Sequence, residues 1–319
     1  MAVYVNTNVS SLNGRRYLNN VQNQLTTTYQ RLSSGLRINS AKDDAAGLQI
    51  SSRLTTQING LNQGNRNSND GIAFAQTAEG AMDEITGMLQ KMRTLAVQAR
   101  NGTNTLDDRK ALGKEATALA EEITRIAKQT KYGGSLILDG AGAGSIMTKG
   151  GAAGGQPPQG GKDEVGKLTL QVGANKGDTV SFEVNAMKFS QIAKNAGIQD
   201  NDLKSFWSAG GGQQGGGAIK VSFTKAENID KAIDGLDKMI GSVDASRAGL
   251  GAIQNRLESS IRNQANVSAN QSDARSRIRD ADFAEESANL SQQSIIQQAA
   301  TSMLMQANTR PQLGLSLLG

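Results

Sequence analysis

The chain has 319 residues, of which 37% are hydrophobic, 20% charged and 3% aromatic, and its formal net charge is +5. It contains no cysteine and no histidine, which excludes disulfides, thiol nucleophiles, imidazole bases and the usual zinc ligand sets. With few aromatic residues and only three prolines, the composition favours long uninterrupted helices over a bulky globular core. Basic residues are interspersed with acidic ones and lack interleaved aromatic residues, so we expect no nucleic-acid partner.

Residues 1–42 predict a polar helix with one apolar stripe. The stripe recurs at steps of three and four residues and consists of Leu18, Val21, Leu25, Tyr29, Leu32 and Leu36. Such a helix is stable when a partner covers the stripe, so we interpret it as a partner-dependent interaction helix, with a frayed surface helix as the alternative. Ser33-Ser34-Gly35 predicts a bend, after which Ser40 or Asp43 is the predicted cap of a new helix.

Residues 43–139 and 226–282 predict a helical bundle domain. Its stripes have the periodicity of packed helices: Ala78, Met82, Ile85, Leu89, Met92 and Ala96; Leu112, Ala116, Leu119, Ile123 and Ile126; and Ile229, Leu236, Val243, Leu250 and Leu257. A break is predicted at residues 101–104, followed by a capping box formed by Thr105 and Asp108. Tyr132-Gly133-Gly134 is the predicted stop of that helix.

Residues 140–225 predict a variable middle region. The stretches 140–161 and 210–217 are rich in glycine and predict loops or linkers. Between them, residues 167–184 predict a β-hairpin, because apolar and polar residues alternate on both sides of a turn sequence. The part around Phe206-Trp207 predicts a small satellite of unspecified fold. The glycines after residue 139 lack the following helix of a dinucleotide-binding motif.

Residues 283–319 predict a helix that pairs with residues 1–42. Its apolar positions are Phe283, Leu290, Ile296, Met303 and Leu304, and Pro311 is its predicted end. This segment is weakly acidic, whereas residues 1–42 contain five basic side chains and no acid, so the two helices have complementary charge. The predicted fold class is mainly α: a folded-back rod of long helices, made of a terminal coiled-coil pair and a helical bundle domain, with a β-hairpin and an irregular glycine-rich middle segment.

The pattern contains neither a catalytic constellation nor a membrane segment. The acidic pairs Asp43-Asp44, Asp107-Asp108 and Asp280 with Asp282 lie at predicted helix starts or in helical contexts, where the helix dipole itself favours negative charge. The first residues lack the basic and apolar parts of a secretory signal, and no window reaches the about 18 apolar residues that span a bilayer. We therefore expect no enzyme, no cofactor, no metal and no membrane insertion; a secreted enzyme that uses the middle region is the alternative.

Several motifs resemble those of bacterial flagellins. They are residues 5–12, Val-Asn-Thr-Asn-Val-Ser-Ser-Leu; the stretch from Arg31 to Leu54; and residues 275–284, Arg-Ser-Arg-Ile-Arg-Asp-Ala-Asp-Phe-Ala, followed by Gln297-Gln298-Ala299-Ala300. The resemblance covers residues 1–139 and 226–319 but not the middle. It implies a structural subunit of the flagellar filament, exported unfolded through the flagellar channel without a cleaved signal peptide and polymerised when its terminal helices become ordered.

The resemblance also implies partners. These are other flagellin subunits in a homopolymer, an export chaperone, and the cap and hook-junction proteins, and the implied location is the extracellular filament. A hook-filament junction or cap-adjacent flagellar protein shares the terminal helices and is the alternative.

Two sets of residues are the candidate sites. The predicted assembly interface consists of Leu18, Val21, Leu25, Leu32, Leu36, Leu290, Ile296, Met303 and Leu304. By resemblance, Lys91, Leu95 and Glu115 correspond to the patch that the vertebrate flagellin-sensing Toll-like receptor, an innate immune receptor, recognises. Lysine at position 91, where arginine is usual, keeps the charge and loses the planar guanidinium fork. The residues alone favour a plainer interpretation, in which Leu95 packs in the bundle.

Overall fold

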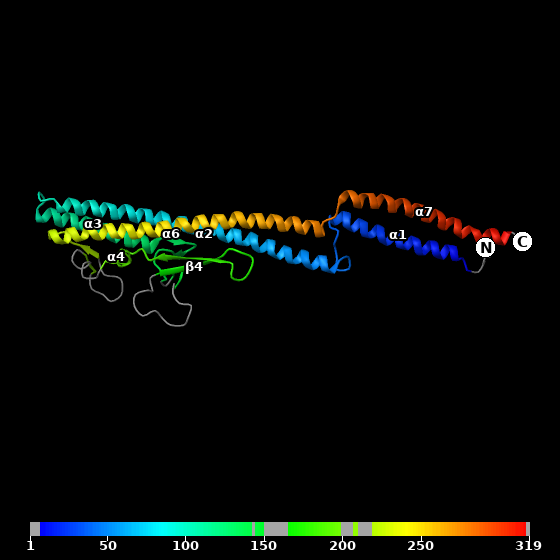
Figure 1. The fold of residues 1–319 in the computed structure, drawn as a ribbon, viewed down its shortest axis with the longest axis horizontal. Helices are drawn as coiled ribbons and strands as arrows, with labels where there is room; N and C mark the ends of the chain where they lie inside the picture. The colour runs from blue at the N-terminus through cyan, green and yellow to red at the C-terminus, as the bar shows by residue number, and fades with distance from the viewer. Residues whose placement is uncertain (1–6, 142–143, 150–164, 199–206, 210–218, 317–319) are drawn as a thin grey trace. The chain divides into compact units, whose positions relative to one another are not determined.

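The computed structural model describes residues 7–141, 144–149, 165–198, 207–209 and 219–316 (Figure 1). The fold is mainly α, which confirms the predicted class. Its elements in chain order are α1 (Val9–Ser34), α2 (Ala45–Arg100), α3 (Leu106–Gln129), β1 (Lys131–Tyr132), β2 (Ser135–Leu136), β3 (Thr148–Lys149), β4 (Val165–Gln171), β5 (Thr179–Asn185), α4 (Phe189–Asn195), β6 (Trp207–Ala209), β7 (Ile219–Val221), α6 (Ala226–Arg279) and α7 (Phe283–Ser316). None of the described helices is long and apolar enough to cross a membrane.

The chain divides into two compact units. Residues 1–59 and 266–319 form the first unit, and residues 60–265 form the second. The boundaries predicted from the sequence, 42/43 and 282/283, fall in the segments between helices, and the division at those positions stays a prediction.

The first unit contains the antiparallel helices α1 and α7 (Figure 1). Asn8 caps α1, because its side-chain oxygen accepts a hydrogen bond from the Ser11 N–H at 3.0 Å. Gly35 ends α1 with φ 72°, the left-handed conformation that glycine adopts without strain. This confirms the predicted bend. At the start of α7, the Asp282 carboxylate accepts from the Ala284 N–H at 2.8 Å.

The prediction that Pro311 ends the last helix is wrong, because α7 continues to Ser316. Proline has no N–H, so the carbonyl four residues earlier, that of Ala307, loses its usual donor within the helix. The Asn8 side-chain amide donates to this carbonyl at 2.7 Å instead. A contact from the other end of the chain thus satisfies the acceptor that the proline leaves open.

The turn between α1 and α2 folds around the Asp43 carboxylate. This group accepts hydrogen bonds from the N–H of Ser40 at 2.8 Å and of Asn39 at 3.1 Å, and from the Ser40 hydroxyl at 3.1 Å. The bond from the Ser40 backbone is the main cause that holds the pKa of Asp43 below its usual value. The prediction that Ser40 or Asp43 caps the next helix is wrong: Asp44 accepts from the Gly47 N–H at 2.9 Å. Asp43 is committed to the turn and is not available as a cap.

The same turn is joined to the segment that follows α6. The Arg37 N–H donates to the Arg279 carbonyl at 2.7 Å, and the Ala281 N–H donates to the Gly35 carbonyl at 3.0 Å. Ile38, in the same turn, is 2% exposed, and its Cδ1 lies close to Gly47 of α2. The segments 35–38 and 279–281 therefore form a short two-stranded link at the base of α1 and α7.

The second unit contains the main hydrophobic core. The six stripe positions of α2 between Ala78 and Ala96 are at most 1% exposed, and the heptad positions of α6 between Ile229 and Leu257 are at most 2% exposed. On α3, Ala116 is fully buried while Leu112 is half-buried. The stripes predicted from periodicity are therefore the core-facing sides of these helices.

The start of α3 confirms the predicted capping box. The Thr105 hydroxyl accepts from the Asp108 N–H at 3.3 Å, and the Asp108 carboxylate accepts from the Thr105 N–H at 2.9 Å. The predicted stop at Tyr132-Gly133-Gly134 is wrong, because α3 ends at Gln129. Gly133 and Gly134 do take positive φ, 57° and 86°, but they form the tight turn between β1 and β2.

The predicted β-hairpin is confirmed as the antiparallel pair of β4 and β5, in which Leu168 lies opposite Phe182. The predicted loop 140–161 contains one more short strand, β3, which pairs with β4; residues 150–164 lie outside the described residues. The hairpin reaches α2 at Gly64, where a Cβ would collide with the Val172 carbonyl. Gln264 of α6 donates to that same carbonyl.

Two small elements complete the second unit. The helix α4 packs against the core through Phe189 and Ile192, which are at most 1% exposed. The strands β6 and β7 pair with each other, which places a strand at Trp207 that the sequence pattern did not specify. The predicted loop 210–217 and Phe206 lie outside the described residues.

Candidate assembly surface

Four contacts fix how α1 and α7 pair. Each contact joins α1 or its N-cap to a residue of α7, and the residue number on α7 falls as the number on α1 rises. The contacts are Asn8 with Ala307 at 2.7 Å, Gly14 with Leu304, Thr28 with Gln293 at 3.2 Å, and Arg31 with Glu286 at 3.0 Å. The contact at Gly14 is close, because a Cβ there would come within 3.1 Å of Leu304 Cδ1. The helices are therefore antiparallel with one defined register.

The predicted assembly residues lie on α1 and α7, except Leu36, which follows α1 and bridges to Asp280, and they differ in exposure. Val21 is 4% exposed. Half-buried positions are Leu18, Leu25, Leu32, Leu36, Leu290, Ile296 and Leu304. Met303 is 70% exposed, and Phe283, a member of the same predicted stripe, is 69% exposed. Those two side chains therefore contribute little to the packing of α7 on α1, in contrast to the sequence interpretation of one common stripe.

Sequence reasoning missed a second set of apolar side chains on these helices. They are exposed by at least 54%: Val9, Leu12 and Tyr17 of α1, and Ile295 and Met305 of α7. A signal was present in the runs Ile295-Ile296 and Met303-Leu304-Met305. Adjacent residues project about 100° apart around a helix, so a single partner helix does not cover all of them. These two runs indicate that more than one face of α7 is apolar.

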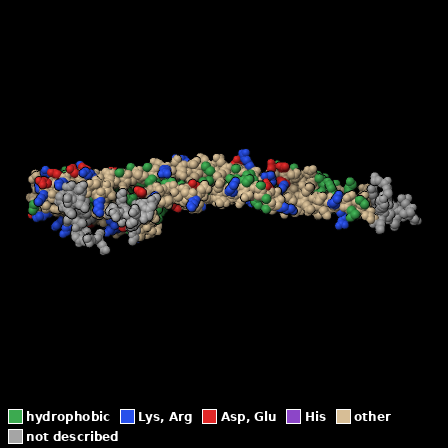
Figure 2. Space-filling model, turned by 60° about the horizontal axis from the view of Figure 1, so that its bottom comes forward, with side chains coloured by type: hydrophobic (Ala, Val, Ile, Leu, Met, Phe, Trp, Pro, Cys, Tyr) green, Lys and Arg blue, Asp and Glu red, His purple; other side chains and the backbone are tan. Residues whose placement is uncertain are grey.

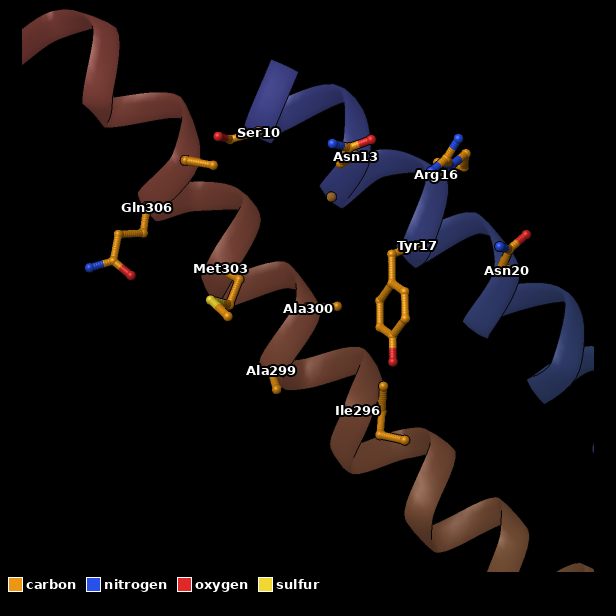
Figure 3. A pocket seen from close by; sticks show the side chains of 12 residues that line it. Ser10, Asn13, Arg16, Tyr17, Asn20, Ile296, Ala299, Ala300, Met303 and Gln306 are labelled. Atoms are coloured by element: carbon orange, nitrogen blue, oxygen red, sulfur yellow. The ribbon is translucent and has the colours of Figure 1, made fainter. Parts of the chain in front are cut away.

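A groove of about 810 Å³ lies between the two helices (Figure 3). Its walls include Tyr17 and Asn13 of α1 and Ile296, Ala300 and Met303 of α7. In Figure 3 the Tyr17 ring extends from α1 toward α7. Figure 2 shows apolar side chains reaching the visible surface in small groups among Lys and Arg. Contiguous exposed apolar surface is typical of interaction sites, which makes the groove between α1 and α7 the candidate for one.

An ion pair joins α1 to α7. Arg31 Nη1 and Glu286 Oε1 are 3.0 Å apart, and the side chains are 32% and 9% exposed. In the described part of the chain, Arg31 Nε and Glu286 Oε2 have no hydrogen-bond partner. A nearly buried carboxylate is costly without its cation. The ion pair therefore disfavours any shift of α7 that separates these two residues.

The residues predicted for receptor recognition are in the second unit. Lys91 Nζ lies 3.2 Å from Glu115 Oε1, and both side chains are about half exposed, at 59% and 47%. Leu95 is only 7% exposed and belongs to the core cluster, as the plainer interpretation predicts. Arg93, its neighbour on α2, pairs with Asp237 at 2.5 Å. Lys91 and Glu115 are therefore both accessible to a partner, whereas Leu95 offers little surface.

Several members of the acidic pairs have roles in local structure. Asp44, Asp108 and Asp282 each accept backbone N–H groups at the start of a helix, where the helix dipole favours a carboxylate. Asp107 pairs with Lys110 at 2.9 Å. These carboxylates are used as caps and ion-pair partners and do not converge on a common site.

Paired terminal helices with uncovered apolar side chains define the class of this protein: an α-helical subunit with a surface suited to self-association. Family models support a particular family. The bacterial flagellin N-terminal helical region matches residues 5–143, and the bacterial flagellin C-terminal helical region matches residues 233–318. The chain belongs to the bacterial flagellin family, and it is a structural subunit of the flagellar filament rather than an enzyme.

Full-length relatives agree with this assignment. The chain is 40% identical over 378 residues to flagellin A of Vibrio anguillarum and 38% identical over 383 residues to polar flagellin C of Vibrio parahaemolyticus, with 100% of both chains covered in each case. A solved structure described as a putative flagellar hook-associated protein from Vibrio parahaemolyticus is similar in fold, with a TM-score of 0.53 at 14% identity, covering 75% of this chain and 100% of that chain. That similarity shows the fold alone.

Proposed function

We propose that this subunit is exported unfolded and polymerises at the filament end when α1 and α7 become ordered against neighbouring subunits. The observation that carries the proposal is the exposure of Leu12, Tyr17, Ile295 and Met303, each by at least 54%, in a chain taken by itself. Ordering a helix costs about 1–2 kcal/mol per residue in backbone entropy. Burial of these side chains between subunits offsets that cost, so assembly and ordering occur together.

The nine predicted assembly residues have two roles in this proposal. Those that are buried or half-buried, such as Val21 and Leu290, hold α1 and α7 together within one subunit. Met303, together with the exposed residues that the sequence analysis missed, contacts other copies. Contacts that do not close on themselves produce an open helical polymer instead of a ring.

The proposed partners follow from the state of α7 before assembly. An apolar helix in transit is prone to aggregate, so an export chaperone covers it, and the cap and hook-junction proteins receive it outside the cell through the same helices. The proposed location is the extracellular filament. The alternative, a hook-filament junction or cap-adjacent protein, is less well supported, because flagellins match the chain over its whole length.

The experiment is seeded polymerisation followed by negative-stain electron microscopy. We expect long filaments from the full chain and none from a chain lacking residues 283–319. A sharper comparison uses Ile295→Ser, at a site 67% exposed on α7, with Leu106→Ser as the matched control, at a site 56% exposed on α3. We expect Ile295→Ser alone to suppress elongation. Filaments from the deleted chain would contradict the terminal-helix mechanism. A few copies of this chain at the filament base, instead of many along the filament, would support the junction-protein alternative.

We also propose that the free subunit is a ligand of the vertebrate flagellin-sensing Toll-like receptor. The accessible pair of Lys91 and Glu115 supports this, while Leu95 contributes by packing beneath the helix surface. In reporter cells, we expect Lys91→Ala and Glu115→Ala to weaken the response to purified monomer, and Glu122→Ala, which removes the exposed partner of Arg125 on α3, to leave it unchanged. No response to the unmodified monomer at saturating dose contradicts the proposal.

A further inference from the structure

Asn8 connects two backbone groups that cannot be paired within their own helices. At the start of α1, its side-chain oxygen accepts from the Ser11 N–H at 3.0 Å. In α7, its side-chain nitrogen donates to the Ala307 carbonyl at 2.7 Å. Ala307 is four residues before Pro311, which has no N–H to give it. One amide therefore caps the first helix and completes the hydrogen bonding of the last.

Asparagine suits this position chemically. Serine, aspartate and asparagine all cap helix N-termini well, but a carboxylate only accepts hydrogen bonds, whereas the amide of asparagine carries an acceptor and a donor on opposite sides. Capping alone does not require the donor. The contact with Ala307 does.

We propose that Asn8 is a positioning residue that sets the register of α7 on α1 during assembly. The Ala307 carbonyl differs from the carbonyls of the preceding turns of α7. The residue four positions later is Pro311, which has no N–H to donate to it. A slide of one helical turn, about 5.4 Å, brings Asn8 opposite a carbonyl that already has its helical donor. The slide also separates Arg31 from Glu286 and Gly14 from Leu304. One register therefore satisfies all three contacts.

This inference rests on the proposed assembly mechanism and deepens it. In that mechanism the two terminal helices order only when a subunit joins the filament, so their register is chosen at that step. Asn8 and Ala307 are half-buried in the single chain, and coverage by neighbouring subunits removes the water that otherwise replaces a lost hydrogen bond.

The test is a double-mutant cycle on the full chain, read as the critical concentration for elongation of filament seeds. Asn8→Ser keeps the cap and removes the side-chain amide that donates to Ala307, and we expect it to raise the critical concentration about fivefold, the equivalent of about 1 kcal/mol for one hydrogen bond. Pro311→Ala gives Ala307 a donor from within α7. In the Pro311→Ala background we expect Asn8→Ser to raise the critical concentration less than about twofold, because the donor is then no longer needed.

Asn8→Asp provides a second variant. It retains the cap and directs a carboxylate at the Ala307 carbonyl, so we expect a rise of about tenfold or more, because a lost hydrogen bond is joined by repulsion. A pure capping role predicts no rise for Asn8→Asp or Asn8→Ser. Equal effects of Asn8→Ser in both backgrounds overturn the register role while polymerisation itself stands.

Complete loss of elongation is also decisive. If Asn8→Ser abolishes elongation, its recovery in the Pro311→Ala background supports the inference, and the absence of recovery overturns it. Failure of the unmodified chain to elongate seeds contradicts the proposed function instead, so the two failures are distinguishable.

Discussion

The two units of this flagellin bury apolar residues to different extents. In the second unit, long runs of side chains such as Met82, Ile85 and Leu89 are 0% exposed. In the described part of the first unit, Val21, Ile38, Ile58 and Ala300 are the buried hydrophobic residues, whereas Phe283, Ile295 and Met303 are exposed by 67–70%. The second unit therefore has a continuous hydrophobic core. The first unit leaves apolar side chains exposed, which supports the proposed assembly against neighbouring subunits.

The largest expected effect is a core truncation that affects one unit and not the other. Leu89→Ala removes a side chain that is 0% exposed, and we expect it to lower the free energy of unfolding of the monomer by about 2–5 kcal/mol. Ile296→Ala, on the groove of α7, is expected to leave the monomer's unfolding transition unchanged and to lower the temperature at which filaments depolymerise. Urea unfolding of monomers and thermal depolymerisation of filaments measure the two quantities.

The control for this pair is Val97→Ala, at a site 49% exposed on α2, which should change the free energy of unfolding by less than about 0.5 kcal/mol and leave the depolymerisation temperature unchanged. An equal loss of monomer stability from Ile296→Ala and Leu89→Ala would show that the first unit carries a core of its own. The contrast between the units would then be abandoned.

A glycine pair on α2 tests how the hairpin is fixed to the second unit. Gly64→Ala drives a methyl group into the backbone carbonyl of Val172, whereas a methyl group on Gly80 of the same helix would meet no atom within 4 Å. We expect Gly64→Ala to destabilise the monomer by about 1–3 kcal/mol and Gly80→Ala to stabilise it by about 0.5–1 kcal/mol. Urea unfolding of both variants measures these changes. If the two substitutions changed the free energy of unfolding in the same direction, the close approach of Val172 to Gly64 would be contradicted.

The ion pair of the first unit is expected to matter less. Arg31→Met leaves the Glu286 side chain, which is 9% exposed, without its cation. Because the Arg31 side chain is itself about one-third exposed, we expect the pairing of α1 and α7 in the filament to be weakened by only about 1 kcal/mol. Adding Glu286→Gln to Arg31→Met should recover most of it by removing the uncompensated charge. Filament depolymerisation temperatures provide the measurement, and a double variant worse than the single one would argue against an isolated buried carboxylate.

Periodicity predicted the second unit well and the first unit less well, for a physical reason. Where a stripe faces one continuous core, as from Ile229 to Leu257, its spacing alone identifies the buried side. Met303 satisfies the same spacing but is exposed, because periodicity does not say whether the covering partner belongs to the same chain. The helix end predicted at Pro311 is wrong because the donor that replaces its missing N–H comes from Asn8, near the opposite end of the sequence and beyond the reach of any local pattern.

The remaining errors concern short-range choices between chemically similar residues. Asp43 and Asp44 are adjacent and both suited to capping; the hydrogen bonds from Ser40 commit the first to the turn and leave the second for the helix. The strand β3 has two residues, too few for alternation to be visible. The candidate assembly residues, apart from Leu36 beyond the end of α1, lie on α1 and α7, and their assembly role stays a prediction; their different exposures required the structure.

The smallest expected effect concerns acid and the turn at Asp43. Hydrogen bonds from Ser40 and Asn39 hold the pKa of this carboxyl below its unfolded value of about 3.8. A depressed pKa means that the ionised group stabilises the folded turn fully above the unfolded pKa, and that this contribution is lost as the pH falls through the folded pKa. Carboxyl-carbon NMR titration should therefore give Asp43 a midpoint below that of an aspartate in a short peptide, and Asp43→Asn should flatten the acid dependence of turn stability without altering the second unit. A midpoint at or above the peptide value would show that the turn does not depend on this carboxylate, and the link between residues 35–38 and 279–281 would then have to hold the base of α1 and α7 by itself.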